Sequence, residues 1–117
     1  MLLVEDEPLI LMDLEYAAQD RGYAAFCASG VQKALDLIRS NRTICAAVLD
    51  VSLRDGETCV PIARELEQLG IPYVLHSGDL DRQNEVVNDL NAELIPKPAA
   101  ASQVIGRAIE LAHRKAA

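Results

Sequence analysis

Features typical of several protein classes are missing from this chain. There is no run of Lys or Arg, and 18 acidic residues outnumber 11 basic ones, so the formal net charge is −7. Binding to the phosphates of a nucleic acid needs a basic surface, so we expect no direct contact with DNA or RNA. No apolar run approaches the length of a membrane span. The N-terminal MLLVEDEP becomes acidic too early for a signal peptide. We therefore expect a cytoplasmic protein with no membrane partner.

Cysteine and histidine are too few and too scattered for a structural metal site. Cys27, Cys45 and Cys59 are odd in number, and no two of them have the CxxC spacing. His76 and His113 lie far apart and have no metal-ligand spacing to a cysteine or carboxylate. This pattern argues against a disulfide framework and against a zinc or iron site. We interpret the three cysteines as small core residues.

What is present is the composition of a globular domain. Half of the residues, 50%, are apolar and 25% are charged, as in ordinary folded proteins. A chain of 117 residues can bury one core and has no room for two. We expect one domain over residues 1–117.

Short apolar runs alternate with stretches of helical periodicity, which is the pattern of βα units around a parallel sheet. AAVL and YVL are continuous apolar runs, as expected for strands buried on both faces. The fold class is therefore α/β, with a doubly wound sheet. The predicted strands are Leu2–Val4, Ala24–Cys27, Cys45–Leu49, Tyr73–His76 and Glu93–Ile95.

Between these strands, apolar residues recur at helical spacing. The predicted buried faces are Ile10, Leu14 and Ala17; Val31, Ala34, Leu35 and Ile38; Ile62, Leu66 and Leu69; and Val104, Ala108, Leu111 and Ala112. We expect Ser29 to cap the second helix, and Gly22 and Gly70 to end helices. A weakly apolar helix over Gln83–Asn91 is expected to be the most mobile one.

Polar side chains follow the ends of four predicted strands. Glu5 and Asp6 follow the first strand and Asp50 follows the third. Ser77 follows the fourth strand, and Lys97 comes shortly after the fifth. The carboxyl ends of parallel strands meet at one edge of the sheet, which is where doubly wound folds bind ligands. We expect these five side chains to lie close together.

Carboxylates at one edge require a cation among them. Two such charges about 4 Å apart repel by ~4 kcal/mol at an effective dielectric of 20. An all-oxygen site with few protein ligands suits Mg²⁺. The predicted ligands are Asp6 and Asp50, Glu5 directly or through water, and the backbone carbonyl of Ser52.

With Mg²⁺ bound, Asp50 can attack phosphorus as a carboxylate nucleophile. Lys97 and the Ser77 hydroxyl would stabilise charge on the transferring oxygens. The expected product is an aspartyl phosphate.

In this combination the sequence resembles the receiver domains of two-component response regulators. The resemblance spans essentially the whole chain. It is carried by LLVEDEP, by AAVLDVSL with Asp50, by Ser77, and by the dipeptide Lys97-Pro98. GETCVPIARELEQLGIPYVLHSG further resembles a group of stand-alone bacterial receivers. The implied fold is flavodoxin-like, (β/α)5, with strand order 2-1-3-4-5.

The resemblance also implies partners and chemistry. The phosphodonor would be a sensor histidine kinase or a histidine phosphotransfer protein, and Asp50 would become a 4-aspartylphosphate. The chain would catalyse only its own phosphotransfer and autodephosphorylation, and it would switch protein–protein interactions in a two-component phosphorelay. A homodimer is one possible assembly. A cis peptide bond is expected before Pro98.

Three positions depart from the family pattern. Leu94 stands where the family usually has Tyr or Phe three residues before the lysine. Ala99 replaces a common Phe, and Arg54 replaces a frequent Pro. We expect these changes to leave the chemistry intact and to alter the way in which phosphorylation is read out.

Two alternatives remain. A degenerate receiver would act as an interaction module without phosphorylation. A phosphatase with an aspartate nucleophile would need a second Asp as general acid, and Ser52 occupies that position. His76 is expected to be a strand-end residue that hydrogen-bonds to the backbone, outside the site.

Overall fold

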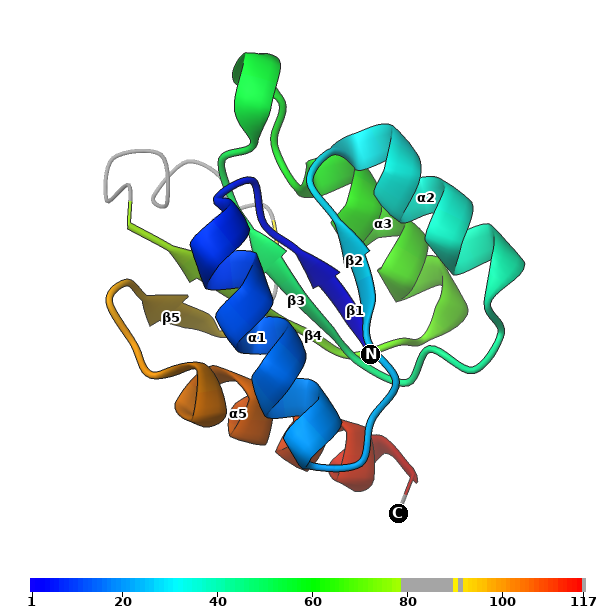
Figure 1. Ribbon diagram of the computed structural model, residues 1–117. Helices are drawn as coiled ribbons and strands as arrows, with labels where there is room; N and C mark the ends of the chain where they lie inside the picture. The colour runs from blue at the N-terminus through cyan, green and yellow to red at the C-terminus, as the bar shows by residue number, and fades with distance from the viewer. Residues whose placement is uncertain (79–89, 91, 117) are drawn as a thin grey trace.

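A computed structural model describes residues 1–78, 90 and 92–116, which form a parallel sheet with helices on both faces (Figure 1). The elements are β1 (Leu2–Val4), α1 (Pro8–Asp20), β2 (Phe26–Ala28), α2 (Val31–Ser40), β3 (Ala47–Asp50), the 3-10 helix η1 (Arg54–Gly56), α3 (Val60–Leu69), β4 (Tyr73–Ser77), β5 (Leu94–Pro96) and α5 (Ala101–Ala116). The helix predicted over Gln83–Asn91 lies outside the described residues, apart from Leu90.

The strand order is β2-β1-β3-β4-β5, and every pair of neighbours is parallel. The predicted fold class and strand order are therefore confirmed. Val4 of β1 is in register with Leu49 of β3, and Asp50 of β3 is in register with His76 of β4. This register places the ends of the central strands side by side, beneath the residues that follow them.

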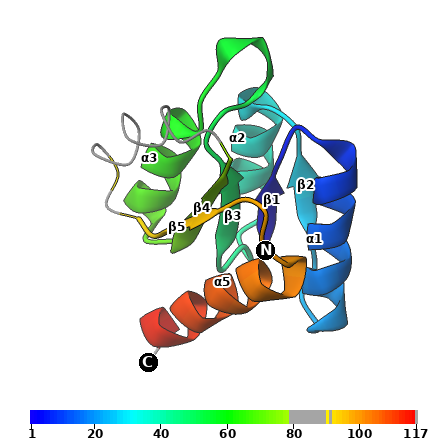
Figure 2. The same ribbon diagram turned by 90° about the vertical axis from the view of Figure 1, so that its left-hand side faces the viewer.

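The sheet separates two apolar layers. Leu49 and Leu75 face the layer that includes Leu66 of α3, whereas Val48 and Val74 face the layer that includes Ile105 of α5. Figures 1 and 2 show α2 and α3 on one face, and α1 and α5 on the other. Because both faces are covered, successive strand residues are apolar, which explains the continuous runs in the sequence.

Glycines end two helices as predicted. Gly70 follows α3 with φ 70°, and Gly22 lies just after α1 with φ 84°. The prediction for Ser29 is wrong, because the residue before α2 is Gly30 and it makes no side-chain cap. Instead, the carboxylate of Glu57 accepts a hydrogen bond from the Val31 N–H at 3.4 Å. A side chain distant in sequence thus replaces the local cap.

Two other local predictions are wrong. Leu69 is 53% exposed, because α3 turns Ile62, Ala63 and Leu66 toward the sheet. Cys45 is exposed, since β3 begins only at Ala47. Within ranges 1–78 and 92–116, no helix is both long and apolar enough to cross a bilayer.

Candidate functional site

Three carboxylates meet at the carboxyl edge of the sheet. Glu5 and Asp6 follow β1 directly, and Asp50 is the last residue of β3. Each of the three offers an oxygen that lies within 4.8 Å of the oxygens of the other two. Glu5 is only 1% exposed and Asp50 only 5%, whereas Asp6 is partly open to solvent. The predicted acidic cluster is therefore present in the fold.

Lys97 is the cation nearest to this cluster among the ion pairs of the described residues. Its Nζ lies 2.7 Å from Glu5 Oε1 and 3.3 Å from Asp50 Oδ2. Its backbone N–H donates a hydrogen bond to the Ser77 carbonyl at 3.0 Å, which holds the end of β5 against the end of β4. The bond from Lys97 to Pro98 is cis, so that prediction is confirmed. The lysine thus reaches the first and third strands from the fifth.

The pKa values of the two buried carboxyls move in opposite directions. Burial, followed by the neighbouring Glu5, raises the pKa of Asp50 to about 8. Burial also opposes ionisation of Glu5, but hydrogen bonds with Asp50, Lys97 and the Glu7 N–H hold its pKa below the ordinary value. For Lys97, burial acts against the charge, yet its contacts with Glu5 and Asp50 raise its pKa. Of the two carboxyls, Asp50 therefore loses its proton less readily than Glu5.

This arrangement could hold a metal ion. Three carboxylates face a single ammonium group, so full ionisation leaves a surplus of negative charge. Burial is the largest cause of the raised pKa of Asp50, and the negative charge of Glu5 adds to it. The donor atoms are all carboxylate oxygens, which suit a hard divalent cation.

The other predicted site residues lie at the same edge. Ser77 is the last residue of β4 and is 1% exposed, next to Lys97 through the backbone contact described above. Ser52 follows Asp50 by two residues and pairs with Thr58 in an isolated bridge. The Ser52 carbonyl as a metal ligand and the Ser77 hydroxyl as a phosphoryl contact stay predictions.

Sequence reasoning did not predict one of the contacts at this edge. Arg54 in η1 donates a hydrogen bond from Nη2 to the Asp6 carbonyl at 3.2 Å. The contact joins residues 48 positions apart. No local pattern marks an exposed arginine as a bridge of this kind, so sequence reasoning had no signal for it. The effect is to tie the loop after β3 to the loop after β1.

The prediction that His76 hydrogen-bonds to the backbone is wrong. It is buried, and neither ring nitrogen has a hydrogen-bond partner among the described residues.

Two of the positions that depart from the family pattern can also be located. Ala99 and His76 both line a small pocket beside Lys97. Leu94 begins β5 and packs against the layer beneath α2 and α3.

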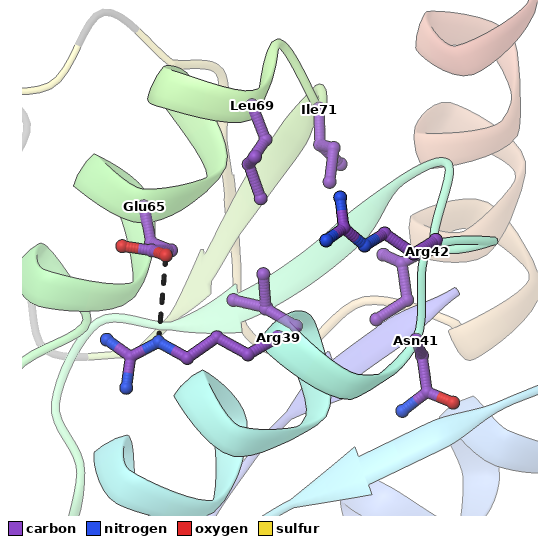
Figure 3. A pocket seen from close by; sticks show the side chains of 8 residues that line it. Arg39, Asn41, Arg42, Glu65, Leu69 and Ile71 are labelled. Carbon is purple, nitrogen blue, oxygen red and sulfur yellow. Dashed lines mark ion pairs between the residues drawn. The ribbon is translucent and has the colours of Figure 1, made fainter.

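A separate pocket lies at the opposite edge of the sheet. It has a volume of about 520 Å³ and lies where α2 and α3 end (Figure 3). In Figure 3 the Arg39 side chain points toward Glu65, and the Arg39 Nε lies 3.8 Å from the Glu65 Oε1. The guanidinium of Arg42 extends toward Leu69 and Ile71. This pocket contains none of the acidic-site residues.

No family model and no curated protein matches the sequence. Solved structures do match. SdrG from Sphingomonas melonis Fr1 is 30% identical with a TM-score of 0.77, over 96% of this chain and 93% of that one. A response regulator receiver protein from Sinorhizobium medicae WSM419 is 25% identical with a TM-score of 0.81, over 97% and 94% of the two chains. A CheY-like receiver domain from Methanospirillum hungatei JF-1 is 19% identical with a TM-score of 0.82, over 98% and 94%, and supports the fold alone.

Proposed function

Since the chain belongs to the receiver domains of two-component response regulators, we propose that it accepts a phosphoryl group on Asp50 in a Mg²⁺-dependent reaction. One observation carries this proposal. The Asp50 carboxylate is nearly buried at the end of the central strand, 3.3 Å from the Lys97 ammonium and beside the oxygens of Glu5 and Asp6. A lone surface aspartate would have none of these neighbours.

In the proposed step, a carboxylate oxygen of Asp50 attacks the phosphorus of a phosphohistidine. An O–P bond forms and the N–P bond to the donor imidazole breaks; the electron pair of that bond stays with the leaving nitrogen, which takes up a proton. Lys97 stabilises the negative charge of the transferring oxygens, since its ammonium already lies within reach of Asp50. The Ser77 hydroxyl is proposed to contact the phosphoryl group after transfer.

Glu5, Asp6, Asp50 and the Ser52 carbonyl would hold the Mg²⁺. When bound, the cation supplies positive charge at the phosphoryl oxygens and reduces repulsion between them and the carboxylates. Asp50 must be ionised to attack, and a nearby positive charge favours ionisation. Without a cation, the pKa of Asp50 is about 8. Bound Mg²⁺ would lower this pKa and so favour the ionised, nucleophilic form.

The proposed partners follow from this chemistry. The donor is a sensor histidine kinase or a histidine phosphotransfer protein, and residues 1–117 act as one receiver domain in the cytoplasm. The chain is a signalling module and has no substrate to turn over. It changes its protein contacts on phosphorylation.

The test is to incubate the protein with acetyl phosphate, with and without Mg²⁺, and to measure intact mass. We expect a hydroxylamine-sensitive phosphoryl adduct only with Mg²⁺. Asp50→Asn should abolish it, and Asp55→Asn is the matched control because Asp55 is exposed in the loop after β3. Beryllium fluoride with Mg²⁺ should perturb the amide NMR signals of wild type and leave those of Asp50→Asn unchanged.

Other outcomes separate the alternatives. Absence of both adduct and perturbation in folded wild type would contradict the proposal and favour a phosphorylation-independent interaction module. Repeated turnover of phosphate esters would instead indicate a phosphatase, although Ser52 offers no carboxyl as general acid.

A further inference from the structure

A small pocket lies beside Lys97 on the face of the sheet covered by α1 and α5. Its volume is about 160 Å³. Its walls include Ile10, Asp13 and Leu14 of α1, His76 of β4, and Pro98 and Ala99 between β5 and α5. Lys97 and Ala101 complete the lining. The walls are therefore mostly apolar, with His76, Asp13 and Lys97 as the polar residues.

His76 is anomalous in this position. Other strand residues on the same face, such as Val48 and Val74, are apolar. His76 is 3% exposed, and neither ring nitrogen has a hydrogen-bond partner in the described part of the chain. Buried polar groups without hydrogen-bond partners are rare in native proteins, so each one needs a physical explanation. A ligand that hydrogen-bonds to the imidazole would supply one.

The size of the pocket limits that ligand. An apolar cavity of about 150 Å³ binds one benzene molecule, whereas sites for drug-sized ligands begin near 300 Å³. At about 160 Å³ the pocket accommodates one aromatic ring. Ile10, Leu14 and Pro98 provide the apolar walls that such a ring needs.

Charge limits the ligand further. Asp13 is exposed and lines the pocket, and the chain as a whole carries a formal charge of −7. Lys97 also lines the pocket, but its ammonium is already paired with Glu5 and Asp50. The negative charges therefore disfavour a ring that carries a carboxylate or sulfonate. Burial, followed by the positive charge of Lys97, lowers the pKa of His76. The neutral imidazole has one N–H donor and one acceptor nitrogen, and it can therefore pair with a hydroxyl.

We propose that this pocket binds a single neutral aromatic ring that carries a hydroxyl group, with the hydroxyl hydrogen-bonded to His76. Either a small free phenol or the tyrosine side chain of a docked protein supplies this chemistry. The site contains none of the carboxylates of the acidic cluster, although Lys97 lines the pocket and also pairs with Glu5 and Asp50.

The test is an NMR titration of the folded protein with p-cresol, observed at the imidazole signals. His76 and His113 are the two histidines of the chain, so His113 serves as an internal reference. We expect a saturable shift of His76 and none of His113. Toluene lacks the hydroxyl and should bind about three- to tenfold more weakly, the value of one net hydrogen bond. The anion p-hydroxybenzoate should also bind more weakly than p-cresol.

Two variants locate the site. Ala99→Phe should fill the pocket and abolish the p-cresol shift, whereas Ala100→Phe, at the neighbouring exposed position, should leave it unchanged. His76→Leu should make p-cresol bind no better than toluene, as detected at the methyl signals of Ile10 and Leu14. If His76→Leu does not fold, Ala99→Phe carries the test alone.

N-acetyltyrosinamide and N-acetylphenylalaninamide then distinguish the two sources. Displacement of p-cresol by the tyrosine compound alone would identify a protein side chain as the ligand, and displacement by neither would identify a free phenol. The proposal is overturned if p-cresol gives no saturable shift of His76, if toluene binds equally well, or if Ala99→Phe leaves binding unchanged.

Discussion

Asp50 is a nearly buried carboxyl in the acidic cluster of the candidate site. Its pKa is raised from an ordinary value of 3.8 to about 8 by burial and by Glu5. A carboxyl with a raised pKa favours folding only while it is protonated. Its contribution to the free energy of unfolding is therefore complete below about pH 4 and is lost as the pH rises to about 8. The function proposed above needs the ionised form, so stability and reactivity conflict at this one side chain.

Asp50→Asn should therefore stabilise the protein when no divalent cation is present. The free energy of unfolding of the variant, relative to wild type, should increase between pH 4 and pH 8 and exceed wild type by at least about 1 kcal/mol at pH 8. Urea denaturation across this range, with a chelator present, measures the difference. A constant difference from pH 4 to pH 8 would contradict the burial of an ionisable Asp50.

Two comparisons support that experiment. Asp55→Asn should show no such pH dependence, because Asp55 is exposed and asparagine tolerates its φ of 60°. Adding Mg²⁺ should raise the melting temperature of wild type and have little effect on Asp50→Asn. The proposed cation site exists only in the folded protein, so stabilisation should grow with the Mg²⁺ concentration.

Helix ends in this fold depend on backbone conformation as much as on side chains. Gly70 ends α3 with φ 70°, in the left-handed region that disfavours a Cβ atom. By contrast, Gly106 lies inside α5, and a Cβ built there would meet nothing closer than Arg21 Nη1 at 3.7 Å. The same substitution should therefore have opposite effects at these two positions.

We expect Gly70→Ala to lower the free energy of unfolding by about 1–2 kcal/mol. Gly106→Ala should raise it by about 0.5–1 kcal/mol, because alanine is the better helix former. Chemical denaturation of the two variants against wild type measures both changes. Equal signs would show that the backbone at Gly70 is not held in the left-handed region.

The pattern of apolar residues predicted the helices better than their exact orientation. Ile62, Leu66 and Leu69 share one helical spacing, yet only the first two are buried. The helix ends at Leu69, whose side chain lines the open pocket beside the end of α2. Local periodicity indicates a face but not how far the neighbouring element extends beneath it.

The whole molecule is built on one sheet with two apolar layers, so we expect it to unfold cooperatively. Leu66 is fully buried in the layer beneath α2 and α3. Leu66→Ala should reduce the free energy of unfolding by about 2–5 kcal/mol, through lost burial and the cavity left behind. Leu69→Ala on the same helix, at a position 53% exposed, should change it by less than about 1 kcal/mol.

Urea unfolding followed by circular dichroism and by tyrosine fluorescence measures these values. The two probes should give coincident transitions for wild type and both variants. Separate transitions would contradict a single cooperative unit. Similar losses at the two leucines would contradict the orientation of α3.

Residue order alone was enough to predict the parallel sheet, its strands to within a few residues, and the edge at which Glu5, Asp50 and Lys97 meet. The reason is that a buried parallel strand must be apolar throughout, and that the carboxyl ends of all strands in a parallel sheet lie at the same edge. Only the tertiary structure decided the contacts that join distant segments: the Lys97 ion pairs, the Arg54 bridge to Asp6, and the unpartnered His76. These depend on how side chains from different elements pack, which no local spacing encodes.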